Sequence, residues 1–284
     1  MELFDRLMAM LPFQSNRTIF WIVTIAAIFT LMARIGRRLK PGHHPDYSRT
    51  NRQANLLALA YLILDESDSH WNDPTASDNT AASNARLREQ WGLHSGQDVF
   101  DTVVRLLTVR HHREPWQRLL AARAVAAQAE GGRRPATEQW LAAVRDSSGS
   151  AGGEELKFIK VIEYYEKELG RERFPRNDPV LSLDGFALAQ AVAVATWGVG
   201  LGLISNAESM QLIEQANEVA RREFGSWEAF GRSFLLGEVM ELTGGNVSKE
   251  GLAAAKRRSM RLNFALDDEY GGPWDRLPWQ LQEG

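Results

Sequence analysis

The densest group of side chains that could do chemistry in this chain is a pair of adjacent histidines flanked by arginines. They lie in the stretch "RHHREPW", residues 110–116. Adjacent residues of a helix point about 100° apart, so His111 and His112 could face one metal ion only where a helix ends. Cationic side chains are also favourable at a helix C-terminus by themselves. The stretch is therefore interpreted in one of three ways: as the end of a helix, as a binding surface, or as a catalytic or metal site.

Three tryptophans near the C-terminus form the second group. Trp227 lies in "GSWEAFG", and the tail "GGPWDRLPW" holds Trp274, Asp275, Arg276 and Trp279. A tail with two indoles is too apolar to stay free in water. We expect it to fold back on the domain, with binding to a partner as the alternative.

These two groups supply the candidate binding residues, and we assign no catalytic residue and no metal ligand. The candidates are Arg110, His111, His112, Arg113, Trp227, Trp274, Asp275, Arg276 and Trp279.

Familiar catalytic patterns are missing from the sequence. In "VGLGL", residues 199–203, the third glycine of a dinucleotide loop is replaced, and there is no Walker loop, nucleophile elbow or zinc-protease helix. The absence of cysteine excludes disulfides and thiolate chemistry. The carboxylates of residues 208–223 suit solvated or capping positions. A net charge of −3, with a basic stretch at 255–261 that lacks aromatic residues, argues against nucleic acid. We expect no cofactor.

An apolar segment near the N-terminus predicts a membrane anchor. Residues 18–33 carry no charge and would rise about 24 Å as a helix, and flanking arginines can extend that span. A helix packed on one side of a globular core would show a polar stripe, and a cleaved signal peptide would end in small residues. We predict an N-terminal segment over 1–17, a single transmembrane helix over 18–35 and a basic juxtamembrane linker over 36–53.

The charges around this anchor predict its orientation. Arg34, Arg37, Arg38 and Lys40 follow the apolar run closely, whereas only Arg6 and Arg17 precede it. Because positively charged flanks stay in the cytoplasm, the C-terminal domain should be cytoplasmic on a single-pass inner-membrane protein.

Beyond the linker, residues 54–284 read as one all-α, multi-helix globular domain. Capping signals at Ser95, Ser205, Ser226 and Ser248 mark helix starts, and no strand pattern occurs. "SSGSAGG", residues 147–153, is a domain boundary or a long surface loop.

A second apolar stretch, residues 185–207, is long enough to be considered as another membrane span. It is rich in Ala and Gly, which give little insertion energy, and Gly198, Gly200 and Gly202 should interrupt its helix. We therefore expect a buried core helix.

Three stretches carry a resemblance to a known family. Residues 87–116, residues 202–238 and the closing "PWDRLPW" resemble the YbeU/YbeR-like family, a bacterial domain of unknown function. The resemblance spans most of 54–280, and implies one continuous domain and a bacterial origin. Where the family pattern leads us to expect Trp-Asp…Arg at the start of the central helix, this chain reads "FALAQA", residues 186–191.

Together these features predict a membrane-tethered cytoplasmic protein-interaction domain with a protein partner, such as an adaptor or an immunity protein against a toxin. The alternative is a hydrolase-type enzyme that uses the His111/His112 region.

The orientation can be tested with a reporter enzyme that is active only in the periplasm, fused after Gly284. We expect no reporter activity in intact cells, because the positive flank holds the C-terminal side in the cytoplasm. Activity of that fusion would contradict the orientation and favour a cleaved signal peptide.

Overall fold

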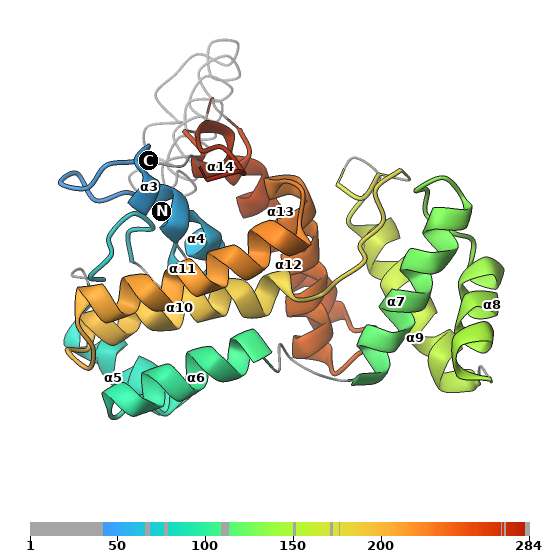
Figure 1. Cartoon of the computed structure of the whole chain (residues 1–284), viewed down its shortest axis with the longest axis horizontal. Coiled ribbons are helices and arrows are strands. Elements are labelled where there is room, and N and C mark those ends of the chain that lie inside the picture. The colour runs from blue at the N-terminus through green and yellow to red at the C-terminus, as the bar shows by residue number, and fades with distance from the viewer. Residues whose placement is uncertain are drawn as a thin grey trace, which may run out of the picture. The chain divides into compact units, whose positions relative to one another are not determined.

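A computed structural model of the chain describes residues 42–65, 69–76, 79–108, 114–149, 152–170, 173–175, 177–267, 269 and 271–281. These residues belong to one compact unit, Pro41–Gly284. Within these ranges every regular element is a helix, which confirms the predicted all-α class (Figure 1). None of the described helices is both long and apolar enough to cross a membrane. The predicted anchor, 18–35, lies outside the described residues and stays a prediction.

The helices follow one another with short connections. Their bounds are α3 Arg52–Leu57, η1 Ala58–Ala60, α4 Tyr61–Leu64, α5 Ala81–Trp91, α6 Gly96–Thr108, α7 Glu114–Ala129, α8 Thr137–Ser148, α9 Gly153–Glu168, α10 Gly185–Gly200, α11 Asn206–Glu223, α12 Trp227–Thr243, α13 Lys249–Ala265 and α14 Pro273–Arg276.

Helix α10 is the centre of the core. All of its residues from Ala187 to Gly198 are buried, and η1, α4, α6, α11 and α12 pack around it (Figure 1). The hydroxyl of Thr196 donates to the Val192 carbonyl within the helix, at 2.9 Å, so this polar side chain needs no outside partner. The expectation that the second apolar stretch is core is confirmed.

The predicted helix starts are confirmed and one predicted break is wrong. Ser205, Ser226 and Ser248 accept hydrogen bonds from backbone amides as N-caps. Helix α10, however, continues through Gly198 to Gly200. A Cβ at Gly198 would lie 2.9 Å from Val99 of α6, so this glycine permits close helix packing there and does not end the helix.

The structure also differs from the sequence prediction at the end of α8 and at α5. Helix α8 extends into "SSGSAGG" and ends at Gly149, whose left-handed backbone (φ 75°) lets its amide donate to the Arg145 carbonyl. The hydroxyls of Ser147 and Ser148 both donate to the Val144 carbonyl. Helix α5 was not predicted. Only Leu87 of that helix is buried, so its sequence carries almost no apolar periodicity.

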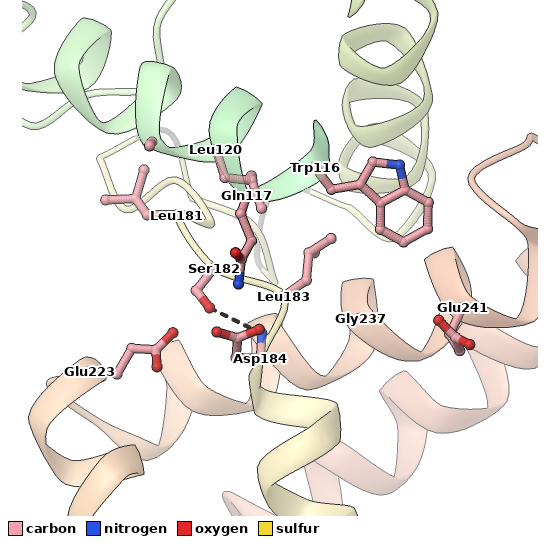
Figure 2. Close-up of a pocket in the computed structure, with 11 residues that line it drawn as sticks. Trp116, Gln117, Leu120, Leu181, Ser182, Leu183, Asp184, Glu223, Gly237 and Glu241 are labelled. Carbon is pink, nitrogen blue, oxygen red and sulfur yellow. Dashed lines mark hydrogen bonds between the residues drawn. The ribbon is translucent and has the colours of Figure 1, made fainter. Parts of the chain in front are cut away.

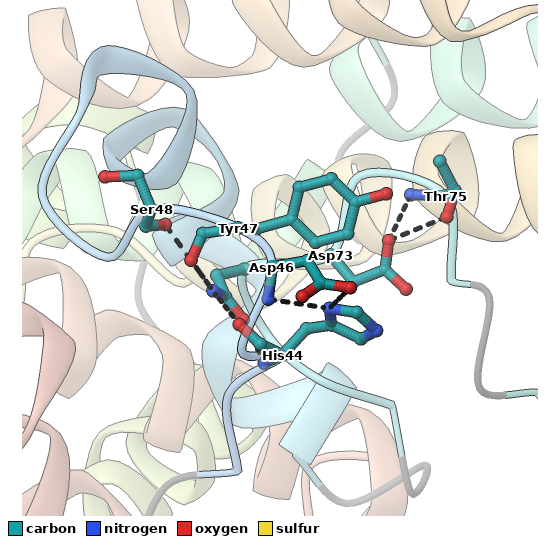
Figure 3. Close-up of polar contacts among 7 residues, drawn as sticks. His44, Asp46, Tyr47, Ser48, Asp73 and Thr75 are labelled. Atoms are coloured by element: carbon teal, nitrogen blue, oxygen red, sulfur yellow. Dashed lines mark hydrogen bonds and ion pairs between the residues drawn. The ribbon is translucent and has the colours of Figure 1, made fainter.

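The segment before α3 is fastened to the loop that follows α4. The buried side chain of Asn72 accepts from the His44 amide at 2.7 Å and donates to the carbonyls of His44 and Tyr47 at 3.1 and 2.9 Å. Next to it, Asp73 accepts from the amide and hydroxyl of Thr75 (Figure 3). Part of the sequence predicted as linker is therefore folded into the compact unit.

The C-terminal tail folds back on the domain, as predicted. Trp274 and Trp279 are buried, whereas Asp275 and Arg276 are exposed. Trp274 stacks on Trp227 with 5.1 Å between ring centroids, and Trp279 meets Trp227 edge to face at 4.9 Å.

Each of these three indoles also donates one hydrogen bond to a carbonyl from another part of the chain. Trp274 donates to Ala58, Trp279 to Phe224, and Trp227 to Leu277, at 2.7–2.8 Å. The guanidinium of Arg221 lies over the rings of Trp227 and Trp279, and burial lowers its pKa to about 9.

This packing predicts that Trp274→Ala and Trp279→Ala each destabilise the domain. Truncating a buried tryptophan costs about 3–5 kcal/mol, which lowers the melting temperature of a domain of this size by roughly 6–20 °C. Thermal unfolding followed by far-UV circular dichroism measures the change. Asp275→Ala, an exposed change on the same segment, is the control and should leave the melting temperature within a degree or two.

Candidate functional site: an acidic pocket between α7 and α12

A small pocket of about 200 Å³ lies between α7, the segment before α10, and the helices α11 and α12 (Figure 2). Its apolar walls include Trp116 and Leu120 of α7 and Leu183 of the segment. Polar groups enter from three sides, and Gln117 extends from α7 toward Ser182 (Figure 2). Apolar walls with a few converging polar groups are typical of binding sites.

The segment of residues 177–184 forms one wall because it is tied to α12. The amide of Gly185 donates to the Ser233 hydroxyl at 2.9 Å, and the amide of Asp184 donates to the Ser182 hydroxyl at 3.0 Å. A side chain at Gly237 would collide with the Leu183 carbonyl. The glycine therefore lets the segment lie directly on α12.

The same wall is tied to α7 by a buried arginine. Arg123 donates to the Val180 carbonyl at 2.8 Å and forms two parallel hydrogen bonds with the Glu166 carboxylate, at 3.0 and 2.8 Å. Arg134 adds a second ion pair to Glu166, at 3.3 Å. The side chains of Arg123 and Glu166 are fully buried, so the pocket wall depends on an ion pair that is shielded from water.

The pocket is acidic. Asp184, Glu223 and Glu241 line it, and among the described lining residues there is no lysine, arginine or histidine. Asp184 is buried, while Glu223 and Glu241 are exposed at opposite ends (Figure 2). Three carboxylates around one small pocket attract a positively charged group.

A second pocket adjoins the first and shares Leu181, Ser182 and Glu223 with it. Its positive charge is already neutralised, because Arg232 forms an ion pair with Asp178. Burial lowers the pKa of Arg232 to about 10, which still leaves it charged at neutral pH. The first pocket, in contrast, is lined by three carboxylates and by no described lysine, arginine or histidine.

The structure describes only some of the residues that the sequence suggested. Arg110, His111, His112 and Arg113 lie outside the described residues, so their role stays a prediction. Trp227, Trp274 and Trp279 come together, but as part of the core, and Asp275 and Arg276 lie exposed beside them. Within the described ranges no three His, Asp or Glu side chains are grouped to hold a metal ion.

Sequence reasoning missed the pocket. Its residues come from four separate parts of the chain between Trp116 and Glu241, and in the sequence Glu223 resembled an ordinary solvated carboxylate. Among the candidate stretches, only "RHHREPW" contains a residue of the pocket, its last residue, Trp116.

The fold and the pocket define an all-helical domain with a small acidic recess. More particularly, the chain belongs to the family described as protein of unknown function (DUF1266), whose model matches residues 86–279. The match includes all residues of the acidic pocket and ends at Trp279. No match was found among curated proteins or among solved structures.

The buried network behind the pocket gives a test of what holds its wall. Glu166→Gln should destabilise the domain by about 3–5 kcal/mol, because two arginines lose their buried counter-charge. Denaturant unfolding measures the free energy of unfolding. Glu154→Gln, an exposed change on the same helix, should alter it by less than about 0.5 kcal/mol. Equal stability of the two variants would contradict this assignment.

Proposed function

We propose that the protein is a membrane-tethered interaction module, held at the cytoplasmic face of a bacterial inner membrane, which binds a protein partner through the acidic pocket. The observation that carries the proposal is the pocket itself, in which Trp116 and three carboxylates line one recess. The tether is proposed from the apolar run at 18–35 and the positive charges that follow it.

The size of the pocket favours one side chain over a whole metabolite. Small-molecule sites usually have roughly 300–1,000 Å³, whereas this pocket has about 200 Å³. A lysine or arginine of a partner fits its chemistry. The aliphatic stem would lie against Leu120 and Leu183, and the charged head would meet the carboxylates. Trp116 adds a ring face for a cation.

Within this role, an adaptor and an immunity protein that neutralises a toxin are the two specific forms we propose, for a protein of the YbeU/YbeR-like kind. In both forms the recess would bind a basic group of another protein. An immunity protein would protect cells that produce its toxin, and an adaptor would not.

Photo-crosslinking tests the proposal directly. A photoreactive residue in place of Gln117, which is exposed and lines the pocket, should give a discrete adduct in cells, whereas the same residue in place of Gln97 on α6 should not. The double change Glu223→Gln with Glu241→Gln should reduce that adduct about tenfold, because a charged hydrogen bond contributes about 1.5–3 kcal/mol.

The matched control for these carboxylates is Glu218→Gln. Glu218 is exposed on the same helix as Glu223 and does not line the pocket, so the adduct should persist. Identical adducts from the Gln117 and Gln97 positions, or an adduct insensitive to the double change, would falsify the pocket as the recognition site.

A further inference from the structure

A shallow apolar groove of about 620 Å³ runs along the outer face of the α7–α8 pair. Alanines from both helices, including Ala121 and Ala142, form its surface, and Val125 stands in it with 63% of its area exposed. Helix α9 packs against α7 and α8, but no described element covers this groove. An exposed aliphatic side chain above small residues is a surface on which another helix can pack closely.

The groove residues have the spacing of a helix-pairing face. On α7 they recur as Arg118, Ala122, Val125 and Ala129, which are separated by four, three and four residues. Gln139, Ala142 or Ala143, and Asp146 repeat the pattern on α8. This is the spacing by which two antiparallel helix pairs form a four-helix arrangement.

The charges on the rim of the groove identify the occupant. Arg118 lies at one end of α7 and Glu130 follows its other end, twelve residues away. A two-fold axis across α7 near residue 124 brings Arg118 of one copy opposite Glu130 of the other, and the reverse. The pairing is available, since Arg118 is 43% exposed and its ion pair with Glu155 is long, at 3.7 Å.

Helix α8 contributes surface to the groove, but the register follows from α7 alone. In the single chain Gln139 of α8 donates to Glu130 at 2.5 Å. Counted from this contact, residue 124 lies about 9 Å along α7, whereas residues 142 and 143 lie only about 5 Å along α8. An axis near residue 124 therefore crosses α8 closer to its C-terminus.

We propose that the α7–α8 groove binds the same groove of a second copy of this chain, antiparallel and around a two-fold axis near residue 124, with Arg118 facing Glu130 of the other copy. The groove and the acidic pocket share Ala121, but Arg118, Val125 and Glu130, on which the proposal depends, do not line the pocket.

The lack of cysteine in the chain permits a clean test by disulfide formation. The full chain with the single change Val125→Cys, oxidised in isolated membranes, should form a dimer of twice 31.9 kDa on a non-reducing gel. The reason is that residue 125 lies beside the axis, and a disulfide needs Cα atoms within roughly 7 Å. The matched control is Leu242→Cys on α12, where the side chain is equally exposed, at 62%, but lies outside the groove.

The register has its own test. In the proposed dimer the two copies of residue 118 lie about 18 Å apart along the axis of α7, so Arg118→Cys and Glu130→Cys should each crosslink poorly alone. Coexpressed with different tags, the two variants should give several-fold more mixed dimer than either gives alone. Crosslinking of Val125→Cys no stronger than that of Leu242→Cys would overturn the proposal. Self-crosslinking of Arg118→Cys without the mixed dimer would overturn it as well.

Discussion

The structure depends on the need to cover α10 on every side. From Ala187 to Gly198 this helix has no exposed residue, so it could not stay in water without the helices around it. The helices that cover it come from both sides of α10 in the sequence: η1 and α4 precede it, and α11 and α12 follow it (Figure 1). Small residues along α10 let these helices approach closely, as at Gly198.

Buried and half-buried arginines hold the remaining layers to this core. Arg258 pairs with Glu238 and donates to the Leu62 carbonyl, Arg221 lies over two indoles, and Arg123 binds Glu166 and Val180. Each guanidinium joins elements that are distant in sequence and satisfies carbonyls or carboxylates away from water. Such planar donors restrict how the helices can be arranged, and the apolar contacts around them provide most of the stability.

Helix α7 is the element on which the two proposed surfaces meet. One side of it contributes Trp116 and Leu120 to the acidic pocket, and another side contributes Ala122 and Val125 to the α7–α8 groove. Its inner side carries Arg123, which ties it to the wall of the pocket. A dimer formed through the groove would therefore present two acidic pockets, and would raise the apparent affinity for a partner that offers two basic groups.

The sequence by itself determined the helical class, most helix starts and the burial of residues 185–207. These features depend on neighbouring residues, because a serine cap or an uncharged Ala-rich run acts over a few positions. It also predicted that the tryptophan tail folds back. The acidic pocket, the α7–α8 groove, helix α5 and the path of α10 through Gly198 were decided only by the tertiary structure. The carboxylates Asp184, Glu223 and Glu241 form a site only because the start of α10, α11 and α12 pack together. No local sequence pattern predicts that packing.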